Sequence, residues 1–274
     1  MTGNLRSWLL PESIDDVLPA EAAALEALRR TLLDHFATHG YRLVRPPLVE
    51  HLDSLLTGSG RDLDLETFKV VDPLSGRLLG VPGIDGDQEV IALLVSSLTT
   101  AGLTGLHLDL AHIGVYRALA SAAGIAGNGD EGALFDALRT KDRPAVRALT
   151  KSLPNAWRNA FEALPELYGP AGEVLRAARA ALPDIPSIAN ALDALDALAR
   201  SAAPLVRALH VDLADLRGYH YHNGAIFSVY TAGEPNAVGK GGRYDGIGKA
   251  FGRARPATGF TLDLRQVAGL LARA

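Results

Sequence analysis

Two stretches near the carboxyl end gather the side chains best suited to holding a small polar ligand. Leu216–Gly224 carries arginine, tyrosine, histidine and asparagine, and we expect it to be a strand whose planar and cationic groups line a site. An ordinary exposed strand rich in tyrosine is the competing interpretation. The stretch GKGGRYDG follows, and its glycines Gly239, Gly241 and Gly242 permit close approach of a ligand to the backbone. Composition alone favours a tight hairpin turn for these glycines.

Eight histidines invite a metal or an acid–base interpretation, but none of the familiar ligand spacings occurs. His107 and His112 lie five residues apart in a strand-like stretch and therefore point to opposite faces. His220 and His222 would share one face of a strand, yet two histidines are an incomplete set of metal ligands. The sequence also lacks a nucleophile elbow and a P-loop. We expect no metal, no cofactor and no catalytic residues.

The composition is that of an ordinary globular chain. Its 274 residues are 48% hydrophobic and 21% charged, and the formal net charge is -4. This balance does not predict disorder, and it does not favour nucleic acid as a partner. The absence of cysteine suits a reducing compartment, and no signal sequence or membrane-length apolar run is found. We expect a soluble, cytoplasmic protein with no nucleic-acid or membrane partner.

Hydrophobic spacing predicts the elements that position these residues. In chain order we expect a helix over 19–40 ended by Gly40, an extended arm or edge strand ended by Pro46-Pro47, a hairpin around a turn at 72–76, a helix over 87–103, a strand over 105–114 and a helix over 115–124. Arms of this kind often lie at dimer interfaces.

The second half of the chain changes character twice. Between Gly124 and about Leu209 strand-like sequence disappears, and prolines divide Ala/Leu/Arg-rich segments into what we expect to be short helices. From His210 onward β-type sequence returns and ends in a closing helix. Since no polar linker separates the halves, we expect one domain over 1–274, with 124–209 as a helical insertion in it.

Taken together, these segments resemble histidyl-tRNA synthetase and, more closely, its paralogous family, the regulatory subunits of short-form ATP phosphoribosyltransferase. SWLLPESIDDVLPAEA looks like the first segment of that family, YRLVRPPLVEHLDSLLTGSGRDLDLETFKVVDPLSGRLLGV is similar to its first motif and hairpin, and GGRYDG with PATGF resembles its C-terminal motifs. The resemblance spans both ends and is loose through the central helices. It implies an α+β fold, a class II aminoacyl-tRNA synthetase-like antiparallel sheet flanked by helices, with an inserted helical region.

The chain departs from the synthetase at three places needed for adenylation. After Val81 it lacks on the order of fifty residues that carry the second motif in the family. In the third motif Asp263 and Gln266 stand where the synthetase has glycine and a triphosphate-binding arginine, and a carboxylate beside a phosphate site is repulsive. The histidine signature becomes 217–222, which keeps the arginine and one tyrosine. Adenylation is therefore expected to fail.

The resemblance implies a non-catalytic subunit that binds the catalytic chain of ATP phosphoribosyltransferase, activates it and relays histidine feedback in the first step of histidine biosynthesis. The retained positions Arg217, Tyr221, Gly241, Gly242 and Tyr244 are the candidate effector-facing residues. Because the missing segment carries histidine contacts in the synthetase, histidine binding by this chain remains open. The partners implied are the catalytic subunit, histidine and a second copy of the chain.

Two other functions compete with this one. The first is an active histidyl-tRNA synthetase-like ligase that activates histidine with ATP, and for tRNA charging it would need an anticodon-binding domain that we do not expect after Ala274. The second is a homodimeric scaffold without a ligand. Adenylate formation would distinguish the first, and failure to bind both histidine and the catalytic chain would favour the second.

Overall fold

The computed structural model describes residues 16–45, 73–127, 131–219, 221–246 and 254–273. The first half holds helix α1 (Pro19–Thr38), strand β1 (Pro73–Leu79), helix α4 (Ile84–Thr100), strand β2 (His107–His112) and helix α5 (Ile113–Ala122). The middle holds helices α6 (Glu131–Arg139), α7 (Arg143–Leu149) and α8 (Asn155–Ala163), strand β3 (Tyr168–Pro170), and helices α9 (Ala171–Ala181) and α10 (Pro186–Ala202). Strands β4 (Ala208–Asp212), β5 (Ala225–Tyr230), β6 (Gly239–Arg243) and β7 (Ala257–Asp263) then lead to helix α11 (Leu264–Leu271).

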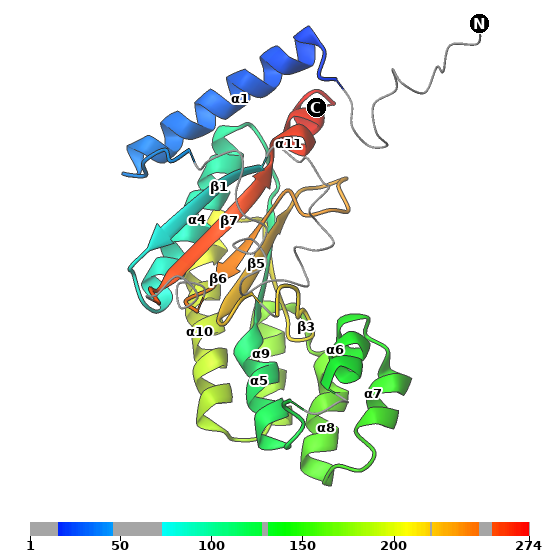
Figure 1. Cartoon of the computed structure of the whole chain (residues 1–274). Coiled ribbons are helices and arrows are strands. Elements are labelled where there is room, and N and C mark those ends of the chain that lie inside the picture. Colours follow the sequence, from blue (N-terminus) through cyan, green and yellow to red (C-terminus); the bar gives the residue numbers. More distant parts are fainter. Residues whose placement is uncertain (1–15, 46–72, 128–130, 220, 247–253, 274) are drawn as a thin grey trace, which may run out of the picture.

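The strands form one sheet in the order β1-β7-β6-β5-β2-β4-β3 (Figure 1). Both halves of the chain contribute, because β1 and β2 lie in the same sheet as β4 to β7. All neighbouring strands are antiparallel except β2 and β4, which are parallel. The expected antiparallel sheet is thus correct apart from this pair. The exception arises because the chain leaves β2, passes through the middle helices and re-enters the sheet in the same direction.

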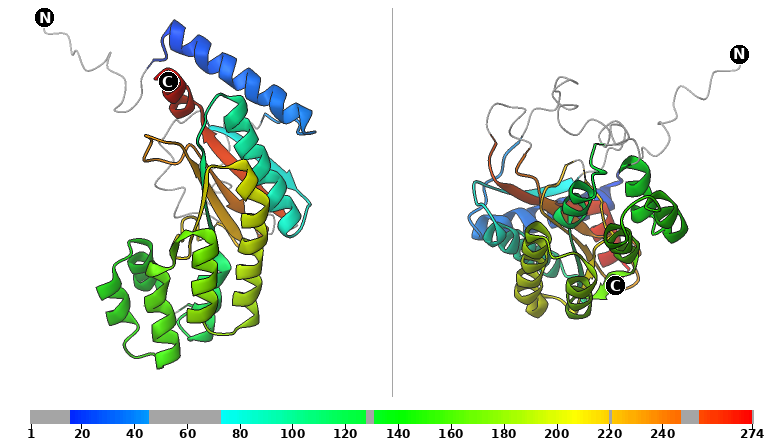
Figure 2. Two further views of the ribbon diagram at one scale, coloured as in Figure 1. Left: turned by 180° about the vertical axis from the view of Figure 1, so that it is seen from behind. Right: turned by 90° about the horizontal axis from the view of Figure 1, so that it is seen from below.

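One face of the sheet is apolar and covered by helices. Leu108 and Leu110 of β2, Val229 of β5 and Leu262 of β7 are buried, and they alternate with polar residues along their strands. Helices α4 and α10 lie over the sheet, as the view from behind shows (Figure 2). The alternation predicts that the other face of the sheet carries the polar side chains, and that face holds the candidate site.

Helices α6, α7 and α8 form a lobe below the sheet (Figure 1). Aromatic side chains pack this lobe against helix α5. Tyr116 of α5 packs edge-on against Phe135 of α6, Phe161 of α8 and Tyr219, with ring centroids 5.3 to 6.4 Å apart. Such pairs contribute about 0.5 to 1.5 kcal/mol each beyond the burial of their area. The middle helices therefore pack firmly on the core.

The described helices confirm the sequence predictions for 19–40, 87–103 and 115–124, and Gly40 and Gly124 adopt the positive φ expected of a helix stop. Two predictions of secondary structure before residue 210 were wrong. Residues 73–76 lie inside β1 instead of a turn, because the missing side chain of Gly76 makes room for the ring of Phe260 on β7. Strand sequence does not vanish over 124–209, since β3 pairs with β4 and β4 begins at Ala208. The Pro46-Pro47 arm and residues 68–71 lie outside the described part.

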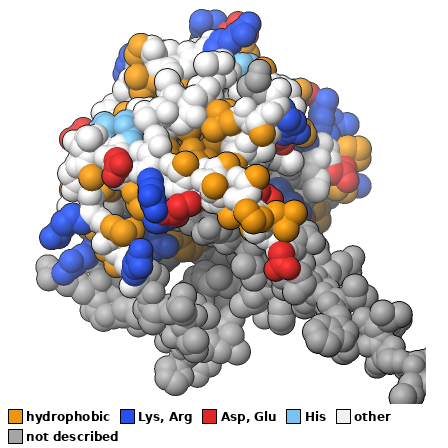
Figure 3. Space-filling model, turned by 90° about the horizontal axis from the view of Figure 1, so that it is seen from above, with side chains coloured by type: hydrophobic (Ala, Val, Ile, Leu, Met, Phe, Trp, Pro, Cys, Tyr) orange, Lys and Arg blue, Asp and Glu red, His pale blue; other side chains and the backbone are white. Residues whose placement is uncertain are grey.

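Exposed apolar side chains occur just before helix α1 and shortly after it. Leu18 precedes the helix and is 68% exposed, whereas Leu43 and Val44 follow it and are 59% and 77% exposed. Seen from above, where α1 and α11 lie, the molecule shows apolar side chains gathered between charged ones (Figure 3). In the described ranges, no helix has the length and apolar character needed to cross a membrane.

The junction between β2 and α5 contains a titratable helix cap. The Gly114 N–H donates to Nδ1 of His112 over 3.0 Å, so this nitrogen must be unprotonated. Burial lowers the pKa of His112 from 6.5 to about 4, with a further contribution from the nearby Arg117. The folded state therefore disfavours the charged ring, whereas the unfolded chain takes up the proton near pH 6.5.

We predict that this histidine makes the fold less stable as the pH falls from 6.5 to 4, by up to about 3 kcal/mol. The free energy of unfolding, measured in urea across this range, checks the prediction. His112→Asn keeps an acceptor for the Gly114 N–H but does not titrate, so it should show a shallower dependence on pH. An equal slope in both proteins would mean that His112 is not the group responsible.

Candidate ligand site on the open face of the sheet

A row of polar side chains crosses six strands on the face opposite the covering helices. Strand register places Ser75 opposite Thr261, Thr261 opposite Lys240, Lys240 opposite Ser228, Ser228 opposite Asp109 and Asp109 opposite His210. Residues directly opposite each other share a face of the sheet. A second row runs beside it through Arg77, Gly259, Gly242 and Ile226. This face, named the open face because helices α4 and α10 cover the other one, carries polar side chains in the first row, and glycines and the apolar Ile226 in the second; Ser228 and Ile226 are buried.

The glycines of GKGGRYDG lie in strand β6 and not in a hairpin turn, which corrects the interpretation from composition. A Cβ on Gly241 would lie 2.2 Å from the Gly259 carbonyl oxygen and 2.7 Å from the ring of Phe227, both on the covered side. A Cβ on Gly242 would lie 2.8 Å from the Ala225 carbonyl oxygen and 2.9 Å from the ring of His222. These strands need glycine for their own packing, and only Gly242 faces the open side.

Tyr221 and Tyr244 meet next to Gly242 on the open face. Their ring centroids are 4.9 Å apart, and burial raises the pKa of Tyr244 to about 12. The Tyr244 hydroxyl is buried and has no hydrogen-bond partner among the described residues. A Cβ on Gly259 would meet this hydroxyl at 3.0 Å and Cγ of Arg77 at 3.2 Å. A buried hydroxyl without a partner is costly, so this point is suited to a ligand.

Arg217 contacts described residues other than this group, although the sequence predicts it in the same site. Its guanidinium forms a bidentate ion pair with Asp215 at 2.5 and 2.8 Å, and its Nη1 donates to the Tyr230 hydroxyl at 3.4 Å. Of the five candidates, the structure thus brings together Tyr221, Gly242 and Tyr244, whereas Gly241 faces the covered side. We find Arg217 already occupied by its own partners.

Residues 216–219 and 221–223 form turns and irregular backbone, and not the strand that the sequence predicted. The backbone amides of Tyr221 and His222 both donate to the Gly218 carbonyl oxygen. Gly218 itself has a φ of +67°, which allows the turn. The expected pairing of His220 and His222 on one strand face therefore fails for His222, and His220 lies outside the described residues. A turn brings the chain back over the sheet, which a straight strand would not do.

Tyr219 anchors these turns to the middle helices. Its hydroxyl donates to Oε1 of Glu131 at 2.8 Å, and its carbonyl accepts from Nη2 of Arg117 at 2.6 Å. The Arg117 guanidinium also lies 4.9 Å from the centroid of the Tyr219 ring. Helices α5 and α6 thus set the position of the turn that carries Tyr221 and His222.

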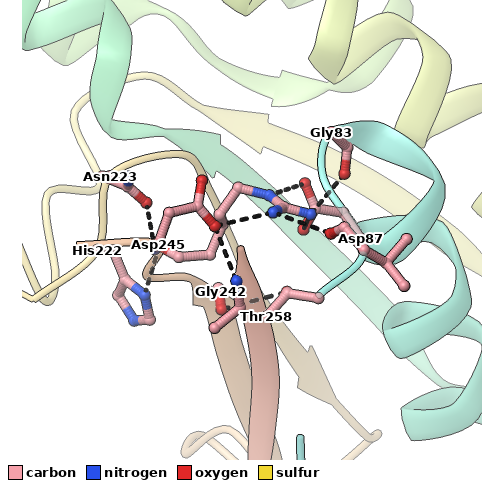
Figure 4. Close-up of polar contacts among 10 residues, drawn as sticks. Gly83, Asp87, His222, Asn223, Gly242, Asp245 and Thr258 are labelled. Carbon is pink, nitrogen blue, oxygen red and sulfur yellow. Dashed lines mark hydrogen bonds and ion pairs between the residues drawn. The ribbon is translucent and has the colours of Figure 1, made fainter. Parts of the chain in front are cut away.

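A buried ion pair on the helix-covered side of the sheet supports the site (Figure 4). The Arg243 guanidinium on β6 pairs with Asp87 of α4 at 2.9 and 3.0 Å, and both side chains are 7% exposed. The same guanidinium donates to Asp245 at 3.0 Å and to the Gly83 carbonyl at 2.5 Å. Arg243 therefore joins the strand that carries Gly242 and Tyr244 to the start of α4.

Sequence reasoning missed Arg77, Gly259 and His222 as site residues. Arg77 was detectable in principle, because it is an exposed polar residue between apolar ones in a strand-like stretch, whereas nothing in the sequence marks Gly259. His222 was noticed only as half of a histidine pair. Among the described residues, no group of three or more His, Cys, Asp or Glu side chains could hold a metal ion.

The chain is similar to proteins of two related kinds. The family model described as histidyl-tRNA synthetase matches residues 13–82 and 78–267. An "ATP phosphoribosyltransferase regulatory subunit" of Ralstonia nicotianae is 46% identical over 318 residues, covering 96% of this chain and 81% of the relative. One of the same name from Thiobacillus denitrificans is 45% identical over 317 residues, covering 96% of this chain and 98% of the relative.

Solved structures share the fold at low sequence identity. An ATP phosphoribosyltransferase regulatory subunit/histidyl-tRNA synthetase from Bacillus halodurans has a TM-score of 0.80 at 19% identity, covering 96% of this chain and 83% of that chain. A histidyl-tRNA synthetase from Nostoc has a TM-score of 0.75 at 14% identity, covering 97% and 76%. A class II synthetase-like fold with an inserted helical region is therefore correct for this chain.

The comparisons also bear on the segment expected to be missing. The match to the family model is split into two segments that meet at residues 78–82. The aligned stretch of the Ralstonia relative is 318 residues long, although this chain has only 274, so the relative carries residues without a counterpart here. The split falls at the place, after Val81, where the sequence motifs predict the loss.

We predict that Arg243→Lys lowers the free energy of unfolding by about 3 kcal/mol, because a lysine leaves part of the buried Asp87 charge uncompensated. Urea unfolding measures the change. Arg217→Lys is the matched control, since that arginine also pairs with an aspartate but its side chain is 49% exposed, and its cost should stay below about 1 kcal/mol. Equal costs at the two sites would contradict a supporting role for Arg243.

We predict that Gly241→Ala destabilises the fold by about 3 kcal/mol, because its Cβ would collide with backbone and with a buried ring. Gly269→Ala in α11, where a Cβ would meet nothing within 4 Å, is the control and should be neutral or stabilising. Thermal and urea unfolding of both variants provide the measurement. If Gly241→Ala is as stable as Gly269→Ala, the close approach of β6 and β7 does not depend on glycine.

Proposed function

The chain belongs to the family of ATP phosphoribosyltransferase regulatory subunits, and we propose that it acts as the non-catalytic subunit of a short-form ATP phosphoribosyltransferase. In this role it activates the catalytic subunit and mediates feedback inhibition by histidine in the first step of histidine biosynthesis. The observation that carries the proposal is the 46% identity to a relative of that name across nearly the whole chain. A solved complex from Thermotoga maritima, titled ATP phosphoribosyl transferase (HisG:HisZ), has a TM-score of 0.61 to this chain at 15% identity and covers 88% of this chain and 97% of that chain.

The contacts of the third-motif residues support a non-catalytic role. Oδ1 of Asp263 accepts the Gln266 N–H at 3.0 Å and so caps helix α11. The Gln266 side chain donates to the Asn236 carbonyl at 3.4 Å. Both positions therefore have structural partners, and neither supplies a cation for a triphosphate. The alternative, a histidyl-tRNA synthetase-like ligase that activates histidine with ATP, is favoured by the shared fold and by the match to the family model described as histidyl-tRNA synthetase.

We propose that the effector site lies over Gly242 and Gly259, with Tyr221, Tyr244 and Arg77 around it. Arg77 forms no ion pair with any described residue, and its guanidinium suits the carboxylate of an amino acid. The unpartnered Tyr244 hydroxyl offers a hydrogen bond beside it. Gly241 contributes through backbone packing, and Arg217 lies outside the effector contacts in this arrangement.

Three further features belong to the same proposal. Residues 1–274 form one synthetase-type domain in this proposal, with 124–209 as a helical insertion. The single sheet to which both halves of the chain contribute supports one domain. A second copy of the chain is expected to bind near α1, where Leu43 and Val44 are exposed. A cytoplasmic location suits a chain without cysteine.

We predict that the chain activates a short-form catalytic subunit and that added histidine reverses the activation. Transferase activity is measured with and without the chain across a histidine titration, alongside histidine-dependent exchange between ATP and pyrophosphate. No exchange is expected, because the third motif lacks its arginine. Exchange activity without any effect on the transferase would overturn the regulatory function and restore the ligase.

We predict that Arg77→Ala leaves activation intact and raises the histidine concentration for half-inhibition about tenfold, the loss of one charge-assisted hydrogen bond. Arg176→Ala on α9, another exposed arginine, is the matched control and should leave that concentration unchanged. Unaltered inhibition in Arg77→Ala would place the effector site elsewhere on the assembly.

A further inference from the structure

The imidazole of His222 fills a space that two glycines leave open. A Cβ on Gly218 would lie 2.5 Å from Cδ2 of this ring, and a Cβ on Gly242 would lie 2.9 Å from Cε1 and Nδ1. The ring thus lies between the turn and strand β6, where any side chain at either position would collide with it. The close-up shows it next to Gly242, at the edge of the Arg243 network (Figure 4).

The ring makes a hydrogen bond that a free imidazole could make equally well. Nδ1 lies 3.2 Å from the Arg243 carbonyl oxygen, and since a carbonyl only accepts, Nδ1 carries the proton. Burial lowers the pKa of His222, which favours the neutral form of the ring. Tyr221 packs edge-on against it, with centroids 5.1 Å apart and the planes at 88°. The space between Gly218 and Gly242 therefore has the shape and the hydrogen-bond acceptor to bind one uncharged imidazole.

The groups beside this imidazole suit the carboxylate of a histidine molecule and offer it one hydroxyl for a hydrogen bond. Tyr221 stacks on Tyr244, whose buried hydroxyl has no partner in the described residues. That hydroxyl and the stem of Arg77 both face Gly259. An amino acid placed here has a cation for its carboxylate and a hydroxyl for a hydrogen bond, but its side-chain position is already occupied.

We infer that His222 occupies, in cis, the imidazole position of the effector site, so that free histidine binds only by displacing it. This inference rests on the proposed function in taking histidine as the ligand. A tethered ring competes at a high effective concentration. The apparent association constant for free histidine equals the intrinsic constant multiplied by the fraction of molecules in which the position is empty. Displacement moves the His222 side chain out of the space between Gly218 and Gly242, and Tyr219 connects the preceding turn to α5 and α6.

The test is a gain of binding on removal of a side chain. Histidine binding to the full-length chain is measured by calorimetry for the wild type and for His222→Ala, and the variant should bind at least about tenfold more tightly. Imidazole alone should bind the variant and not the wild type. His222→Phe, which refills the space without the hydrogen bond, should bind neither compound.

His210→Ala is the matched control, because His210 lies on the same face of the sheet in β4, three strands away from β6, and pairs there with Asp109 at 3.4 Å. Its histidine affinity should equal that of the wild type. Thermal unfolding checks that each variant folds, and His222→Asn, which is smaller and can still donate to the Arg243 carbonyl, replaces the alanine variant if that protein does not fold.

Equal or weaker histidine binding in the folded His222 variants would overturn the inference, because it would make the ring a packing residue or a direct contact to the ligand. The transferase assay reports separately on the proposed function. Tighter binding by His222→Ala together with no activation of the transferase would keep the cis occupancy and reject the regulatory function. Activation by the wild type with no gain of binding would do the reverse.

Discussion

The buried pair between Arg243 and Asp87 is the interaction on which the open face of the sheet depends. It lies where β6, the start of α4 and the connection after β1 come together, and the same guanidinium also binds two backbone carbonyls there. Removing a charge from water is expensive, so such a pair is stable only when its geometry and remaining hydrogen bonds are complete. Because Arg243 precedes Tyr244 and follows Gly242, this one constraint fixes both residues on the open face. The site is therefore supported from the core.

Glycine has an unusual part in this sheet. In β6, β7 and β1 it allows neighbouring strands and rings to come closer than any side chain would permit, at Gly241, Gly259 and Gly76. The result is a surface whose centre is backbone and whose border is aromatic and cationic. Such a surface is shaped for a flat, polar molecule. In this chain the space above Gly242 already holds a side chain of its own, which distinguishes an occupied recognition surface from an empty one.

Periodicity and end signals were sufficient for the helices, because an apolar stripe and a stop such as Gly40 or Gly124 are local properties. The glycine-rich stretch was not readable in the same way. Whether Gly241 lies in a turn or a strand depends on Phe227 and Gly259, which are distant in sequence. Arg217 was assigned to the site by resemblance, and its pairing with Asp215, two residues earlier in the chain, becomes visible only in three dimensions. Tyr221, Gly242 and Tyr244 were placed together by the same resemblance.

The pairing of β1 with β7 has a consequence for the order in which the chain can fold. Leu79 lies opposite Ala257, so the edge of the sheet cannot close until nearly the whole polypeptide has left the ribosome. Helices α6, α7 and α8 contact mainly elements that are near in sequence, and they can form while synthesis continues. The polar face carrying Arg77 is then completed last, and until that moment the apolar side of the unfinished sheet is exposed to other nascent chains.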